Sequence, residues 1–125
     1  MKRRLPHVVP ISKPVQAILD ALRIINGDSA FVFASPVKPL SHLNKETPLQ
    51  ALYSLGYRGR MTAHGFRALA STVLNSESGF SPDVIERQLA HKESDAVRAA
   101  YHRAEYLDKR RELMAWWSGW IAQRS

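Results

Sequence analysis

A stripe of apolar residues between a threonine and a glycine most constrains what this chain can fold into. The stripe consists of Phe66, Leu69, Ala70, Val73 and Leu74. Its spacing predicts a helix with one buried face, for which Thr62 is a suitable N-cap and Gly79 a suitable end. His64 and Arg67 are three residues apart on the flank of the stripe, so they share a side of the helix without being required in its core. We therefore predict that this helix presents a histidine and an arginine to a cleft.

Proline and glycine divide the rest of the chain into further helices. Ser12-Lys13-Pro14 opens one that ends at Asn26-Gly27. Ser81-Pro82-Asp83 is a stronger start, because it joins a cap, a proline and an acid in the first turn. The other predicted helices cover about residues 47–55, 95–103 and 106–123. The β-branched residues around Val9 predict a strand that ends at Pro10 and is a remnant of a β-hairpin. The expected fold class is mainly α.

The last predicted helix carries apolar and basic residues on different sides. Its apolar residues are Leu113, Met114, Trp117, Trp120 and Ile121. Its basic residues Lys109, Arg110 and Arg111 are assigned to another side. A tryptophan-rich helix is more often core than a docking element, so we expect core here and keep a protein-interaction helix as the alternative.

The charge of the chain points to a polyanionic partner. Eighteen lysines and arginines against 11 acidic residues give a net charge of +7 and a sequence pI of about 10.1, which makes nucleic acid the first partner to test. The candidate DNA contacts are Arg58, Arg60, Arg87, Lys92, Arg98 and Arg103. Plain solvated charge is the alternative for each.

Composition argues against several other kinds of site. The chain has no cysteine, which excludes disulfides and thiolate metal sites, and its five histidines lack the spacing of metal ligands. No apolar run is long enough to span a membrane, and no signal peptide follows the basic N-terminus. We expect a cytoplasmic protein with no metal, no cofactor, no membrane partner and no small-molecule substrate.

Five residues could together cut a phosphodiester without a metal. The reaction needs a nucleophile, cations on the non-bridging oxygens and a proton donor for the leaving oxygen. Tyr101 could attack, although a tyrosine with its ordinary pKa of about 10 needs cationic neighbours or a base. Arg67 could clamp the phosphate in a fork. His64 and His91 could donate hydrogen bonds or move protons, and Lys2 could protonate the leaving oxygen.

Each of these residues also has a structural interpretation. His-x-x-Arg pairs such as His64 and Arg67 arise often by chance. His91 could close the helix that begins at Pro82, where a cation suits the dipole. Tyr101 could be a core residue, and Lys2 lies near a terminus, where lysines are commonly disordered.

The order of these motifs resembles the tyrosine recombinases, and most closely the phage-type integrases. Lys2 stands seven residues before Val9-Pro10, as the hairpin lysine of that family stands before its own Val-Pro. His64-Gly65-Phe66-Arg67 is similar to the central motif, and Leu89-Ala90-His91 to the turn that follows it. Tyr101 then matches the nucleophile. The resemblance covers nearly the whole chain.

This resemblance implies site-specific recombination of double-stranded DNA at attachment sites, by a homo-oligomer on the DNA. Tyr101 would form a 3′-phosphotyrosyl link, with Arg67, His64 and His91 holding the phosphate and Lys2 acting as general acid. The protein would be bacterial or phage-encoded.

Three departures from the family pattern qualify the expectation. Another family arginine comes earlier than the hairpin, so we expect residues 1–125 to be the C-terminal part of one incomplete catalytic domain, weak or inactive alone. Ala90 replaces a common glycine. The gap from His91 to Tyr101 is one residue longer than in many relatives, which leaves Tyr106 as a rival nucleophile. The alternative function is a non-catalytic, DNA-binding or self-associating remnant of an integrase.

Overall fold

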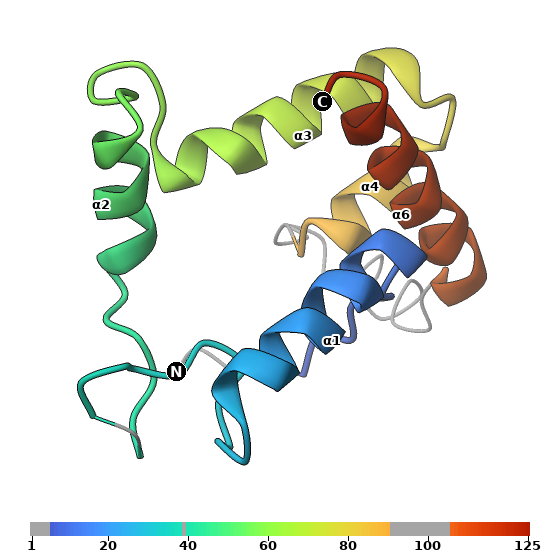
Figure 1. The fold of residues 1–125 in the computed structure, drawn as a ribbon. Helices are drawn as coiled ribbons and strands as arrows, with labels where there is room; N and C mark the ends of the chain where they lie inside the picture. Colours follow the sequence, from blue (N-terminus) through green and yellow to red (C-terminus); the bar gives the residue numbers. More distant parts are fainter. Residues whose placement is uncertain (1–5, 39, 91–105) are drawn as a thin grey trace, which may run out of the picture. The chain divides into compact units, whose positions relative to one another are not determined.

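The computed structural model describes residues 6–38, 40–90 and 106–125, and this part of the chain is mainly helical, as predicted (Figure 1). Its helices are α1 (Lys13–Asn26), α2 (Thr47–Ser54), α3 (Ala63–Glu77), α4 (Pro82–Gln88) and α6 (Leu107–Ala122). The chain divides into two compact units. The first unit contains Met1–Ser12 and Ala70–Ser125, and the second contains Lys13–Leu69.

The capping residues start α3 and α4 where the sequence predicts. The Thr62 hydroxyl accepts a hydrogen bond from the backbone N–H of Gly65 at 3.0 Å, which satisfies a free donor of the first turn of α3. Ser81 has an extended backbone, and its hydroxyl accepts from the N–H of Val84 at 3.4 Å. Pro82 follows in the first turn of α4, where its missing N–H costs nothing. The predicted helix over residues 95–103 lies outside the described residues.

The predicted N-terminal strand is absent from residues 6–12, which have no regular secondary structure. A strand needs a neighbouring strand to satisfy its backbone, and no other described segment pairs with this one. Instead, the carbonyl of Val8 accepts a hydrogen bond from Arg110 of α6. The hydroxyls of Ser12 and Ser118 lie 2.6 Å apart. The segment is therefore held by side chains of α6 and not by a sheet.

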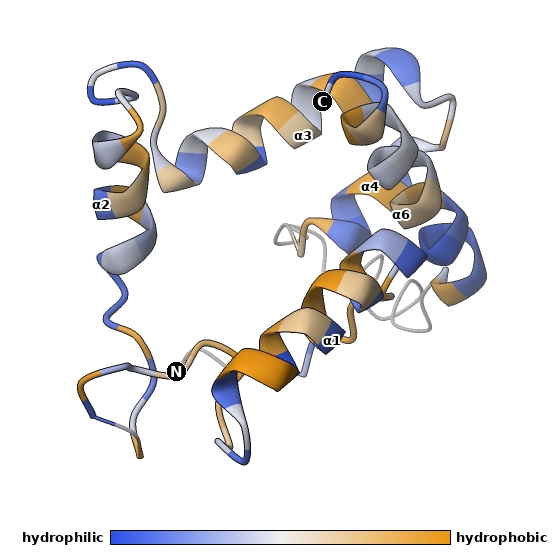
Figure 2. Ribbon diagram, viewed as in Figure 1, coloured by the Kyte–Doolittle hydropathy of each residue, from blue (hydrophilic) through white to orange (hydrophobic). Residues whose placement is uncertain are grey.

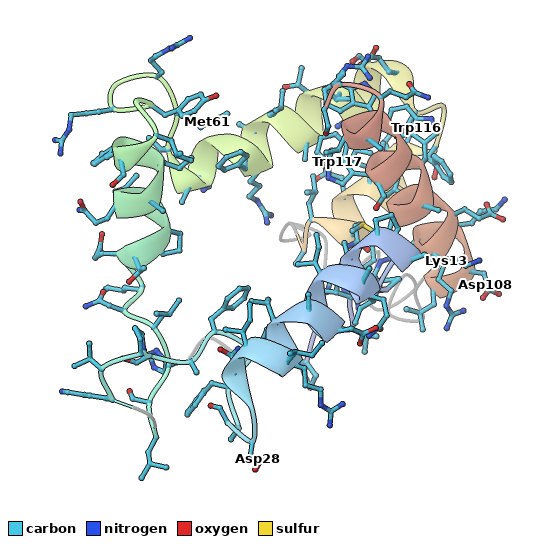
Figure 3. All side chains as sticks on the ribbon, viewed as in Figure 1. Lys13, Asp28, Met61, Asp108, Trp116 and Trp117 are labelled. Atoms are coloured by element: carbon cyan, nitrogen blue, oxygen red, sulfur yellow. The ribbon has the colours of Figure 1, made fainter. Side chains whose placement is uncertain are left out.

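The core of the first unit lies among α3, α4 and α6. Its buried residues are Leu74, Val84, Ile85 and Leu113. Trp116 and Trp117, labelled on α6 in Figure 3, pack against them. Trp117 therefore packs against the core as predicted, Trp116 does so although the predicted apolar side did not include it, and Ile121 of that predicted side is 45% exposed. Fully burying an aliphatic side chain contributes about 1.5–3 kcal/mol, so this cluster is the main source of stability in the described part of the unit.

Arg110 lies on the side of α6 that faces the core, so the prediction that it lies on another side was wrong. Its side chain is 2% exposed, whereas Lys109 and Arg111 are exposed. Positions 106, 110, 113, 117 and 120 follow one another at intervals of three or four, which places them on one side of a helix. Arg110 consequently shares the side of the fully buried Leu113.

The second unit has no buried residue among those described. Hydrophobic and hydrophilic residues mix along α1 (Figure 2), and its residues Ile18, Ile24 and Ile25 are 60%, 85% and 78% exposed. After α1 the chain forms a loop closed by an isolated antiparallel bridge between Ala34 and His42, beside which the N–H of Leu43 donates to the carbonyl of Phe33 at 2.8 Å. These three isoleucines of α1 therefore have little cover within their own unit, whereas Leu19 and Leu22 are half-buried.

Candidate functional site

His64 and Arg67 lie near the start of α3, in the second unit. Their spacing of three residues places them on one side of the helix. His64 is exposed, and Arg67 is half-buried. The structure therefore brings this predicted pair together and leaves the imidazole accessible to a ligand.

The glycine between the two motif residues lies close to the side chains that precede it. A Cβ atom added at Gly65 would lie 2.7 Å from the sulfur of Met61 and 3.3 Å from the hydroxyl of Thr62. The first distance is shorter than real contacts allow, so any side chain at this position would displace Met61. Figure 3 labels Met61, which immediately precedes Thr62 and α3. Gly65 thus leaves room for the side chains of Met61 and Thr62 beside the first turn of α3.

The connector between α2 and α3 carries the predicted DNA contacts Arg58 and Arg60. Both are exposed, and each lies over a tyrosine ring. The guanidinium carbon of Arg58 is 4.2 Å from the ring centroid of Tyr53, and that of Arg60 is 5.6 Å from the centroid of Tyr57. Such stacking occupies the face of a guanidinium and leaves its N–H edge available for an anion. These arginines are therefore oriented by aromatic rings and remain open to solvent.

Arg87, another predicted DNA contact, is in the last turn of α4 and is half-buried. Its Nε atom is buried and has no hydrogen-bond partner in the part of the chain that the structure describes. An unsatisfied buried donor costs about 1–3 kcal/mol. Arg87 is thus a partly enclosed cation and not a freely solvated one.

The remaining predicted site residues lie outside the described residues. They are Lys2, His91, Lys92, Arg98, Tyr101 and Arg103. The rival nucleophile Tyr106 is described, and it is half-buried against the core of the first unit. It occupies the N-cap position of α6, with a left-handed backbone (φ 57°). Tyr106 therefore has a structural role in the first unit.

Sequence reasoning missed a set of polar contacts around Arg110. The Nε–H of Arg110 donates to the side-chain oxygen of Gln88 at 2.9 Å, and its Nη2 donates to the carbonyl of Val8. The Nε2 atom of His7 lies 3.1 Å from the backbone oxygen of Gln88. The sequence did contain one sign of these contacts: Arg110 falls at a position of the apolar stripe of the last helix. A charge buried there needs hydrogen-bond partners.

Two kinds of site are absent from the described residues. No group of three or more histidine, aspartate or glutamate side chains could hold a metal ion in the described ranges. None of the helices in this part of the chain has the length and hydropathy needed to cross a bilayer.

Comparison with known proteins identifies relatives along nearly the whole chain. The phage integrase family matches residues 1–107. Prophage integrase IntA of Escherichia coli K12 is 44% identical over 118 residues, which is 94% of this chain and 28% of IntA. Prophage integrase IntS of the same strain and the integrase of Shigella phage Sf6 are each 41% identical over 125 residues, covering 99% of this chain and 32% of theirs.

No solved structure matches the chain. The chain spans 28–32% of the length of these three relatives. The family match covers far more than half of the chain, and it includes the helix that carries His64 and Arg67. The chain therefore belongs to the phage integrase family.

Proposed function

We propose that residues 1–125 are the C-terminal part of an integrase catalytic domain that recombines double-stranded DNA at specific attachment sites. The match of the phage integrase family to residues 1–107 carries this proposal, together with the relatives that are named integrases. The net charge of +7 supports a DNA partner. Such a protein acts in the bacterial cytoplasm, as a homo-oligomer assembled on the DNA.

The proposed reaction is a metal-free transesterification. The hydroxyl oxygen of Tyr101 attacks the scissile phosphorus and loses its proton to water, while the bond from phosphorus to the 5′ oxygen breaks. Lys2 donates the proton that makes this oxygen a 5′-hydroxyl. The product is a 3′-phosphotyrosyl link, and a 5′-hydroxyl reverses the step by attacking it. The covalent link retains the energy of the broken ester, so rejoining requires no cofactor.

Cations on the phosphate would lower the barrier to this step. Arg67 would hold two non-bridging oxygens, and His64 and His91 would donate hydrogen bonds to them. The exposure of His64 and its position one turn from Arg67 on α3 support this role. The packing of Tyr106 against the core of the first unit supports Tyr101 as the nucleophile.

Other basic residues would bind the DNA backbone around the cleaved phosphate. Arg58 and Arg60 are exposed and oriented by tyrosine rings. A phosphate oxygen beside Arg87 would give its guanidinium the anionic partner that the described residues do not offer to its Nε atom. Lys92, Arg98 and Arg103 complete the proposed set. Contacts to phosphates set position and affinity and leave sequence choice to other contacts.

A tyrosine-to-phenylalanine pair tests the nucleophile. In the full-length protein that contains this chain, Tyr101→Phe should abolish covalent protein–DNA adducts on attachment-site DNA, because phenylalanine has no oxygen to attack phosphorus. Tyr106→Phe is the matched control and should retain adducts. Adducts are detected as a denaturant-resistant gel shift that protease removes. Adducts formed by Tyr101→Phe at the normal level would disprove the assignment.

No residue within 1–125 is assigned to the family arginine that precedes the hairpin lysine. Losing one such phosphate clamp typically costs about 10²–10³ in rate. The 125-residue chain alone should therefore form adducts at least about 100-fold more slowly than the full-length protein. Equal rates for the two proteins would contradict this part of the proposal.

A non-catalytic, DNA-binding or self-associating remnant is the second candidate. The exposed isoleucines of α1, namely Ile18, Ile24 and Ile25, favour it. A remnant would bind DNA with a steep dependence on salt and form no covalent product. Sedimentation at several concentrations, with and without DNA, separates self-association from DNA-directed assembly.

A further inference from the structure

A buried arginine joins three segments of the first unit that are far apart in sequence. Arg110 on α6 is 2% exposed. Its Nε–H donates to the side chain of Gln88, the last residue of α4, at 2.9 Å, and its Nη2 donates to the carbonyl of Val8. His7 contacts the backbone oxygen of the same Gln88 at 3.1 Å. We call Arg110, Gln88, His7 and Val8 the Arg110 junction.

Core stability alone gives no reason for an arginine at this position. Apolar residues that replace a buried charged network are often neutral or stabilising, because desolvation of the charge offsets its attraction to partners. Arg110 lies on the same side of α6 as Leu113, where an apolar side chain would continue the stripe. A planar guanidinium instead donates from several nitrogens fixed in one plane, whereas a lysine donates from a single ammonium that rotates freely. The arginine therefore adds a defined geometry among the three segments.

Each segment of the junction leads along the chain to one proposed catalytic residue. The pairs are Lys2 and Val8, six residues apart, Gln88 and His91, three apart, and Tyr101 and Arg110, nine apart. Gln88 is the last residue of α4, and His91 follows it three positions later, outside the described residues. Between these two residues Ala90 has a left-handed backbone (φ 54°), which turns the chain sharply after α4. The junction thus anchors the starting points of all three segments.

We propose that Arg110 is a positioning residue of the integrase site. It holds Gln88 and Val8, the described residues from which the chain continues to His91 and Lys2, and it lies itself on α6, the helix that follows Tyr101 in the sequence. This inference rests on the proposed function. Arg110 itself touches no DNA, so its loss should slow bond breaking without weakening DNA binding.

The test compares variants of the full-length protein on attachment-site DNA. The sequence of this DNA is found beforehand by sequencing recombination junctions. Arg110→Met removes the whole guanidinium, including the donors to Gln88 and Val8, Arg110→Lys keeps the charge without the fork, and Gln88→Leu removes the acceptor of the Nε–H. Leu74→Val and Leu74→Ala are controls of graded stability, because Leu74 is a core residue outside the junction. Each variant is assayed well below its melting temperature. The readouts are the single-turnover rate of adduct formation at saturating DNA and the dissociation constant for DNA.

A displacement of about 1 Å in a catalytic constellation can lower a rate about 100-fold. Both Arg110 variants and Gln88→Leu should therefore form adducts about 100-fold more slowly than the unaltered protein, with dissociation constants within about twofold. The Leu74 variant of matched melting temperature should keep the normal rate. Gln88→Leu leaves Arg110 in place, so it keeps the test decisive if an Arg110 variant fails to fold.

The possible failures are distinguishable. Adduct formation by the unaltered protein, with equal rates in the junction variants and the matched Leu74 control, would support the integrase function and overturn the positioning role. A loss of DNA affinity with an unchanged rate would also overturn it, because it would make Arg110 a DNA-binding residue. No adduct from the unaltered protein would overturn the proposed function and this inference with it.

Discussion

Ala90 occupies a backbone conformation that disfavours every residue with a Cβ atom. It is exposed and has φ 54°, in the left-handed region, directly after the end of α4. A Cβ atom costs about 1–2 kcal/mol in that region, whereas glycine adopts it freely. Glycine loses more backbone entropy on folding, a penalty of about 0.5–1 kcal/mol relative to alanine. Because the first term is larger, Ala90→Gly should raise the free energy of unfolding by about 0.5–1 kcal/mol.

The same substitution in a helix should have the opposite sign. Ala115 is exposed in α6, in the same unit as Ala90. Its helical backbone suits alanine, so Ala115→Gly adds the entropy penalty and relieves no strain. It should lower the free energy of unfolding by about 1 kcal/mol. The two variants should therefore differ by about 1.5–2 kcal/mol in unfolding free energy.

Urea unfolding followed by tryptophan fluorescence measures this difference. The chain has three tryptophans, and all of them lie on α6, so the signal reports the first unit. The midpoint should rise for Ala90→Gly and fall for Ala115→Gly, with the slope unchanged. A midpoint for Ala90→Gly that falls as far as that of Ala115→Gly would show that position 90 is not left-handed in solution, and would refute the reasoning.

Three further perturbations test the core, a cap and the DNA surface. Leu113→Ala should lower the free energy of unfolding by about 2–5 kcal/mol in the urea assay, because Leu113 is fully buried. Ile121→Ala, 45% exposed on the same helix, should cost clearly less, and equal losses would contradict the observed core. Ser81→Ala should cost about 1 kcal/mol by removing the cap of α4, while Ser81→Asp should retain most of the stability. Arg58→Gln and Arg60→Gln should each reduce the slope of log affinity for DNA against log salt by about 1, and unchanged slopes would remove these residues from the DNA surface.

Local sequence predicted the helices that have strong signals at their ends. The hydroxyls of Thr62 and Ser81 cap α3 and α4 as expected, because a cap depends only on donors within the next three residues. The prediction that His64 and Arg67 share one side of α3 likewise depends only on their spacing of three residues. The roles of these two residues and of Tyr101 remain predictions that the adduct assay tests.

Features that depend on residues far apart in the sequence could not be predicted from local sequence. Apolar residues around Val9 suit a strand, but a strand depends on a partner that local sequence does not specify. The environment of Arg87 was equally hidden, since its partial burial depends on neighbouring elements.

The sequence by itself determined the mainly helical fold, the starts of the capped helices and the motifs that identify the family. These depend on periodicity, caps and residue order, which operate over a few positions. Only the tertiary structure decided that Arg110 is buried and that it joins Val8 and Gln88, which are 102 and 22 residues away in sequence. The free-energy cost of burying a charge depends on whether it finds hydrogen-bond partners. For Arg110 these partners are distant in sequence, and only the folded chain brings them close.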